Sequence, residues 1–403
     1  MGVNVLPSYE RYLMKFSIKA KALAIAAVIA VSSAQPAHAV DLAGSGASFV
    51  VPLVEACKAG FAKKSGHSFV YTSTGSGTGK NNSDNKIGDF WFSDSAHTGA
   101  KKRSTIFHAP IVAAPIAVLV NLPAKKDIYL SSATVAKIFA GQITKWNDPE
   151  IVADNNRSVK SVVYKKTASG NVAVDKSGNP IVLRNSSKTI YYTLPNKPIK
   201  VVFRSDTSGT SNNFTRFMNG VAPTVWTKPA NDAFTTAFPG NINDTANIGR
   251  IVGANGSQGV ATLAAKSPYS ITYAEKQWGT SFGLRAAYVG NASGNFAYPD
   301  SASTSAFLGE AKQAADGIVT FDYNTKVAGA YPIGVVSYML LETSYADKTK
   351  GTAVKELAEY FLSSECATAA APSGFIAIEG TFLAKAKDLL ARANKLSKNS
   401  ITK

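Results

Sequence analysis

Apolar residues along the chain follow two patterns that together predict alternating strands and helices. The run 111–120 is apolar on both faces, which is typical of a strand buried in the centre of a sheet. A second long apolar strand is expected at 331–340. Helical spacing of apolar positions predicts helices at 132–139, 260–266, 353–363 and 382–396. Strands that alternate with helices favour an α/β fold with mainly parallel sheets.

The first 39 residues have the pattern of a secretory signal peptide. Basic residues precede an apolar core at 22–31, and Ala37-His38-Ala39 matches a small-residue cleavage site. Either Met1 or Met14 could be the residue at which translation starts. The core is shorter than the roughly 20 apolar residues that span a bilayer. We therefore expect a periplasmic mature chain, 40–403, with no transmembrane helix and no cysteine placed for a lipid anchor.

The predicted mature chain is longer than one hydrophobic core usually supports, so two domains are expected. The net charge of the whole chain is +17, which suits nucleic acid, an acidic surface or a small anion as partner. Basic residues are not concentrated in a run interleaved with aromatic residues, so nucleic acid is not expected. The four histidines lack ligand spacing, and no metal or cofactor is predicted.

The stretch 157–200 differs from its surroundings, because it carries nine basic residues and a single acid, Asp175. Short strand-like runs separated by Gly-Asn and Ser-Gly-Asn-Pro are hairpin signals. They predict an added basic β-ribbon. A solvated surface is the favoured interpretation of its charge, and a docking patch is the alternative.

Three segments rich in glycine and hydroxyl side chains lie beside expected helix starts, at 44–49, 71–80 and 204–210. Free backbone N–H groups at a helix start attract negative charge. In the third segment, the planar guanidinium of Arg204 suits a tetrahedral oxyanion, and Asp206 is close enough in sequence to orient it. Each segment alone is an ordinary loop, whereas the three together predict one small-anion site.

These segments give the chain a resemblance to the phosphate-binding proteins of ABC uptake systems, and within them to the DING-like subgroup. The matching segments are 44–49, 75–80, 89–94, 138–148, 204–210, 256–260 and 331–333. The resemblance implies a hinged, two-domain "Venus flytrap" with two chain crossovers. Domain I would comprise 40–115 and 335–403, and domain II would comprise 116–334 with the ribbon.

The resemblance also implies inorganic phosphate in the interdomain cleft, delivery to an ABC permease in the inner membrane, a monomer, and no enzymatic activity. The implied phosphate ligands are Ser48, Phe49, Ser76, Asp94, Arg204, Ser208, Gly209 and Thr210. For Ser48 and Phe49 the contact would be a backbone N–H.

Asp94 would select phosphate, because an ionised carboxylate only accepts hydrogen bonds and phosphate still carries a proton near neutral pH. Sulfate has no such proton, so a buried acceptor would stay unpaired. The alternative for Asp94 is a helix cap. For Arg204 the alternative is a surface salt bridge to Asp206, and for Ser76 it is a turn hydroxyl.

Two cysteines, Cys57 and Cys366, would enter an oxidising compartment. A disulfide and two buried free thiols both fit this observation. The resemblance places both in domain I. Two other functions stay open: an exported phosphatase, and a DING-like secreted interaction protein that uses the basic ribbon.

Overall fold

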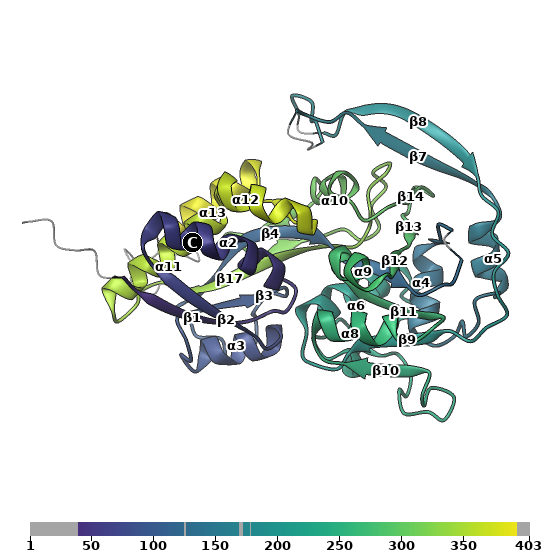
Figure 1. Ribbon diagram of the computed structural model, residues 1–403, viewed down its shortest axis with the longest axis horizontal. Coiled ribbons are helices and arrows are strands. Elements are labelled where there is room, and N and C mark those ends of the chain that lie inside the picture. Colours follow the sequence, from purple (N-terminus) through teal and green to yellow (C-terminus); the bar gives the residue numbers. More distant parts are fainter. Residues whose placement is uncertain (1–38, 125, 169–171, 178, 393–403) are drawn as a thin grey trace, which may run out of the picture. The chain divides into compact units, whose positions relative to one another are not determined.

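The computed structural model describes residues 39–124, 126–168, 172–177 and 179–392 (Figure 1). The predicted signal peptide lies outside these residues, except for Ala39, and stays a prediction. From Val40 onward the chain belongs to one unit, which contains a six-stranded and a five-stranded sheet.

The six-stranded sheet has the order β18-β4-β17-β3-β1-β2. Its strands are β1 (Asp41–Gly46), β2 (Ser68–Ser73), β3 (Phe90–Ser93), β4 (Ile106–Pro115), β17 (Gly334–Glu342) and β18 (Ile376–Ala377). Both long strands, β4 and β17, are buried along their whole length and lie side by side (Figure 1). Around the sheet pack helices α2 (Val51–Ser65), α3 (Ser76–Asp84), α11 (Lys348–Phe361), α12 (Ser364–Ala370) and α13 (Gly380–Arg392), and the 3-10 turn η1 (Ala371–Ser373) follows α12.

The five-stranded sheet has the order β10-β9-β11-β5-β12. Its strands are β5 (Ala117–Val120), β9 (Lys200–Arg204), β10 (Ile251–Ala254), β11 (Ser270–Ala274) and β12 (Arg285–Ala286). The helices of this part of the chain are α4 (Ser132–Phe139), α5 (Pro149–Asn155), α6 (Gly209–Val221), α7 (Phe234–Ala237), α8 (Gly256–Ala265), α9 (Lys276–Phe282) and α10 (Ser301–Leu308). The helix predicted at 132–139 is confirmed with the same bounds as α4.

Three small sheets complete the described chain. They are β6 (Tyr129–Leu130) with β13 (Tyr288–Gly290) and β14 (Phe296–Ala297), β15 (Lys312–Gln313) with β16 (Val319–Thr320), and β7 (Ser158–Tyr164) with β8 (Val182–Thr189). The antiparallel pair β7 and β8 lies within the predicted basic ribbon. Every residue of β8 is exposed, whereas Tyr164 at the end of β7 is buried in the hydrophobic core.

The two-domain α/β architecture is as predicted, but the sheets are mixed rather than mainly parallel. Strand β1 is parallel to β2 and β3, whereas β17 runs antiparallel to both β3 and β4. In the other sheet β9 is parallel to β10 and β11, while β5 is antiparallel to β11 and β12. A run that is apolar on both faces indicates a central strand but carries no information on its direction.

The chain leaves the six-stranded sheet after β4 and enters the five-stranded sheet as β5, with Ile116 between them. The Ile116 N–H donates to the Ile333 carbonyl at 2.8 Å, and the Tyr331 hydroxyl donates to the Ile116 carbonyl at 2.9 Å. Ile333 comes directly before β17, where the chain returns to the six-stranded sheet. The two connections between the sheets therefore lie side by side. The domain boundaries given above stay a prediction.

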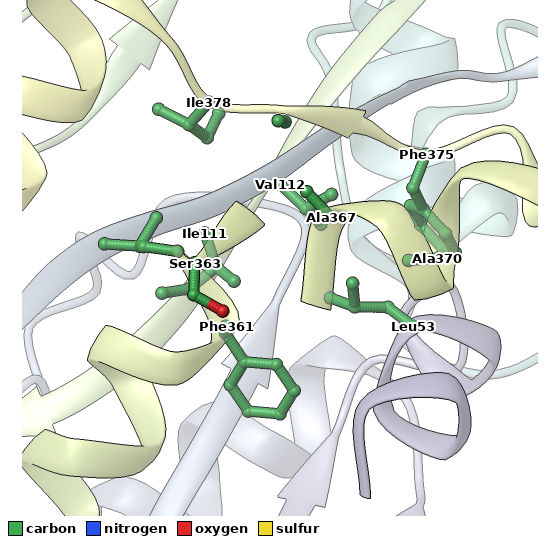
Figure 2. Close-up of a pocket in the computed structure, with 11 residues that line it drawn as sticks. Leu53, Ile111, Val112, Phe361, Ser363, Ala367, Ala370, Phe375 and Ile378 are labelled. Carbon is green, nitrogen blue, oxygen red and sulfur yellow. The ribbon is translucent and has the colours of Figure 1, made fainter. Parts of the chain in front are cut away.

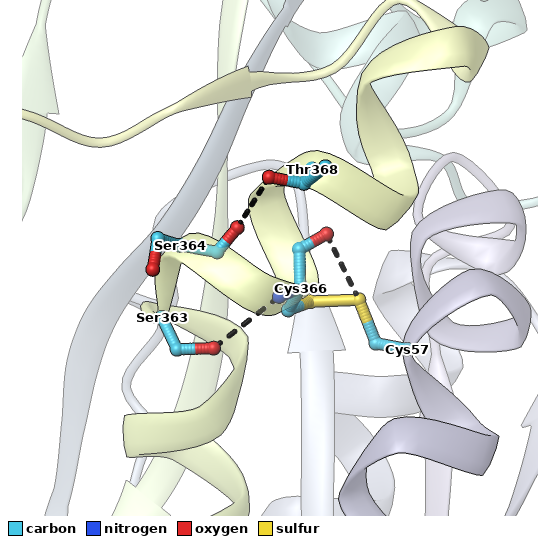
Figure 3. The surroundings of a disulfide bond; sticks show 5 residues. All are labelled: Cys57, Ser363, Ser364, Cys366 and Thr368. Carbon is cyan, nitrogen blue, oxygen red and sulfur yellow. Dashed lines mark hydrogen bonds between the residues drawn. A yellow bond between two sulfur atoms is a disulfide. The ribbon is translucent and has the colours of Figure 1, made fainter.

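Cys57 and Cys366 form a disulfide that joins α2 to α12, with their Cα atoms 5.1 Å apart (Figure 3). Both residues are fully buried. The Ser363 hydroxyl caps α12 by accepting a hydrogen bond from the Cys366 N–H at 3.3 Å. The first and last parts of the described chain are thus covalently linked.

A cavity of about 10 Å³ lies between β4, α2 and α12 (Figure 2). Its walls are mostly apolar side chains, among them Leu53, Ile111 and Phe375. It has room for no more than a single water, so it is a packing gap. Among the described helices, none combines the length and apolarity that crossing a membrane needs.

Candidate anion-binding site

Two long helices begin with backbone N–H groups that are free to bind an anion. Pro52 lies in the first turn of α2, as predicted. Within the described residues, the N–H groups of Ser48 and Phe49 just before α2 have no hydrogen-bond partner, nor do those of Gly209 and Thr210 at the start of α6. Such groups and the helix dipole favour negative charge.

Ser208 begins α6 as its N-cap, and its side-chain oxygen accepts from the Ser211 N–H at 3.2 Å. The hydroxyl proton of Ser208 is not used in that contact, so Ser208 can still donate to an anion. Phe49 differs from the other candidates, because its ring is buried against Phe375 and only its backbone is available.

A chain of hydrogen bonds joins residues of the segments 44–49, 89–94 and 204–210 and of helix α8. The Ser257 N–H donates to Ser48 Oγ at 3.1 Å. Arg204 Nη1 donates to Ser257 Oγ at 3.1 Å and to Thr210 Oγ1 at 3.5 Å. Thr210 Oγ1 donates to Asp94 Oδ2 at 3.2 Å. These predicted residues therefore lie around one small region.

The second predicted segment reaches the same region through Ser76, the first residue of α3. Ser76 Oγ accepts from the Asp94 N–H at 3.1 Å. A Cβ added at Gly209 would lie 2.7 Å from Ser76 Oγ and 2.6 Å from the Ser95 nitrogen. Position 209 therefore needs glycine, because the start of α6 meets the loop after β3 in direct contact.

Arg204 is held by Asp206 through two parallel hydrogen bonds, Nε to Oδ1 at 2.7 Å and Nη2 to Oδ2 at 2.5 Å. Only 2% of Arg204 is exposed, so the interpretation as a surface salt bridge is wrong. Burial alone would lower the pKa of Arg204, but Asp206 raises it above its ordinary value. The guanidinium stays charged and keeps Nη1 directed to Thr210 and Ser257.

Asp94 is also 2% exposed, and no helix begins within 94–105, so its interpretation as a helix cap is wrong. Its Oδ1 accepts from the Ser337 hydroxyl and its Oδ2 from Thr210. Burial raises the pKa of Asp94 to about 6, although Ser337, Arg204 and Thr210 act in the opposite direction. Above that pH the carboxylate is an acceptor at the edge of the site.

Two polar groups of this region were not predicted from the sequence. Ser337 lies within the buried strand β17. The one indication in the sequence is that a serine interrupts an otherwise apolar run, since a buried hydroxyl needs a polar partner. Ser257 lies in the segment 256–260, for which the resemblance implies no ligand role. Both take part in the hydrogen-bond chain described above.

Beside Ser48 and Ser257 a cavity of about 640 Å³ opens. Asn255, Gln258 and Trp278 also line it. It is large enough to admit a small hydrated anion to the buried groups. The described residues include no group of three or more His, Cys, Asp or Glu placed to hold a metal ion.

Residues 32–365 match the family model described as a PBP superfamily domain. The chain is 30% identical over 306 residues to the phosphate-binding protein PstS 3 of Mycobacterium tuberculosis, covering 72% of this chain and 70% of that protein. It is 28% identical over 324 residues to the phosphate-binding protein PstS of Haemophilus influenzae, covering 78% and 82%. Both relatives are named as binding proteins, in agreement with the expectation that the chain is not an enzyme.

Solved structures show the same fold. A high-affinity periplasmic phosphate-binding protein of the DING type superposes with a TM-score of 0.60 at 21% identity, covering 86% of this chain and 93% of that one. The phosphate-binding protein of Stenotrophomonas maltophilia gives a TM-score of 0.59 at 18% identity, covering 87% and 93%. The chain thus belongs to the PstS family of phosphate-binding proteins, within the PBP superfamily.

Proposed function

We propose that the protein binds inorganic phosphate at this site, in the periplasm, and delivers it as a monomer to an ABC-type permease. The proposed ligand groups are the N–H groups of Ser48, Phe49, Gly209 and Thr210, the hydroxyls of Ser76, Ser208 and Thr210, the Arg204 guanidinium and the Asp94 carboxylate. The names of the relatives support the choice of phosphate.

The observation that carries the proposal is the pairing of one buried acceptor, Asp94, with a set of donors. Arg204, Thr210 and the free N–H groups of α2 and α6 suit any tetrahedral oxyanion. Asp94 distinguishes among such anions. At pH 7 it is ionised, since its pKa is about 6, and it needs a ligand that brings a proton.

Phosphate retains a proton at neutral pH and sulfate does not. A phosphate hydroxyl can donate to Asp94, whereas bound sulfate would leave two buried acceptors facing each other with no hydrogen between them. A site that hydrogen-bonds a ligand proton discriminates strongly against an analogue without it. We therefore expect phosphate to bind and sulfate to bind far more weakly.

Titration calorimetry on phosphate-free protein at pH 7.5 tests the proposal. Phosphate should give a saturable heat with about one site, and sulfate at the same concentrations should give none. Thr210→Val should weaken phosphate binding roughly ten- to a hundredfold, because it removes a buried hydroxyl that contacts Arg204 and Asp94. The exposed Thr224→Val is the matched control and should bind as the wild type does.

Delivery is tested separately in cells. Deletion of the gene should abolish high-affinity phosphate uptake, and the wild-type chain should restore it while Thr210→Val should not. Unchanged uptake in the deletion strain would contradict delivery but not binding.

A further inference from the structure

Glu275 is a buried carboxyl beside the anion-binding site that the proposed ligand set does not use. It follows β11 and stands at the N-cap of α9, where its side chain makes no capping hydrogen bond. Only 2% of the residue is exposed. Among the described residues, neither of its carboxylate oxygens has a partner at hydrogen-bonding geometry. An ionised carboxylate in that position would be strongly disfavoured.

The groups that face Glu275 belong to the anion site. Strand β9 pairs with β11, so Arg204 at the end of β9, already paired with Asp206, lies beside Glu275. Ser257 of α8 is near enough to lower the pKa of Glu275. Asp94 adds a negative charge from the other sheet.

The remaining neighbours do not offset that charge. Strand β5 contributes only apolar side chains. Lys276 of α9 lies over the Tyr298 ring, and Arg285 of β12 pairs with Asp127.

Burial is the main reason why the pKa of Glu275 is raised to about 8, and it outweighs the lowering by the backbone N–H of Glu275 itself, by Arg204 and by Ser257. At neutral pH Glu275 is therefore a carboxylic acid, with one O–H donor and no charge. Since Asp206 already neutralises Arg204, an ionised Glu275 would add a negative charge next to a site that has to accept an anion.

We propose that Glu275 is a neutral acid beside the bound anion, and that loss of its proton weakens phosphate binding by adding a negative charge there. This inference rests on the proposed function. Ser257 Oγ accepts from Arg204 Nη1 at 3.1 Å and lies 3.2 Å from Ser48 Oγ. A protonated Glu275 adds no charge beside these side chains. An ionised Glu275 would place a negative charge next to the guanidinium that has to attract the anion.

The test is the dissociation constant of inorganic phosphate between pH 7.0 and 9.0, for the wild type, Glu275→Gln and the exposed Glu379→Gln as control. Wild type and control should bind roughly tenfold more weakly at pH 9.0 than at pH 7.0, because only the protonated fraction is competent. Glu275→Gln should bind at pH 7.0 and should lose this dependence, since its amide keeps a donor and cannot ionise.

Equal pH profiles for wild type and Glu275→Gln would overturn the inference, and so would a flat wild-type profile, which does not depend on the variant folding. Loss of binding at pH 7.0 by a Glu275→Gln protein that melts normally by circular dichroism would also overturn it. Failure of the wild type to bind phosphate at any pH would instead contradict the proposed function.

Discussion

Replacement of Asp94 by asparagine separates the role of this residue in binding from its cost to folding. The change keeps the shape of the side chain, removes the charge and adds an N–H donor. Burial raises the pKa of Asp94 from 3.8 to about 6. A shift of this size corresponds to roughly 3 kcal/mol of unfolding free energy.

The sign follows from the direction of the shift. Because the pKa is higher in the folded state than in the unfolded state, Asp94 contributes full stability below pH 3.8 and loses it as pH rises through about 6. The ligand-free wild type should therefore lose stability between pH 4 and 7 relative to Asp94→Asn. Above pH 7 the variant should be more stable than the wild type by up to about 3 kcal/mol. The free energy lost because its hydrogen bonds to Ser337 and Thr210 are weaker reduces this gain.

The effect on binding should be a loss of selectivity. The amide of Asp94→Asn can donate to sulfate, so discrimination between phosphate and sulfate should fall by roughly ten- to a hundredfold, as expected for a hydrogen bond to a charged group. Urea unfolding of ligand-free protein from pH 4 to 8 measures the first effect, and calorimetric titration with both anions measures the second. A variant that is less stable than the wild type at pH 7.5, with unchanged selectivity, would refute the reasoning.

Three further predictions concern the other parts of the site and the fold. Arg204→Met should cost roughly 2–5 kcal/mol of phosphate binding, since it removes a desolvated charge; calorimetry that shows a loss below about 1 kcal/mol would contradict this. Reduction of the Cys57–Cys366 disulfide should lower the unfolding free energy by about 2–5 kcal/mol, measured by urea unfolding with and without reductant, and equal midpoints would count against it. Gly209→Ala should abolish phosphate binding, because the added Cβ would lie 2.6 Å from a backbone nitrogen, whereas Gly99→Ala, with no atom within 4 Å, should bind normally.

Much of the candidate site was predictable because local sequence determines helix starts. Glycine, serine and threonine before an apolar-periodic run indicate where N–H groups stay free, and this pointed to the segments 44–49, 71–80 and 204–210. The individual ligand residues within them, such as Ser48, Ser76 and Thr210, came from the resemblance to the family and remain predictions. The pairing of Arg204 with Asp206 was predictable as well, since the two residues are separated by one position.

The remaining polar neighbours could not be predicted, because they depend on how distant strands meet. Ser337 contacts Asp94 across a sequence separation of 243 residues, and Glu275 lies near Arg204 only through the pairing of β11 with β9. The directions of β5 and β17 were missed for a similar reason: hydrophobic periodicity indicates burial but not which neighbour a strand pairs with or in which sense.

A crystal structure of the protein grown with phosphate would test the identity of the site most directly. We expect one phosphate ion with an oxygen about 2.5–2.7 Å from an Asp94 carboxylate oxygen, with further oxygens accepting from Arg204, Thr210 and the N–H groups of Phe49 and Gly209. Phosphate bound elsewhere, or bound with Asp94 out of contact, would contradict the proposed site and the selectivity derived from it.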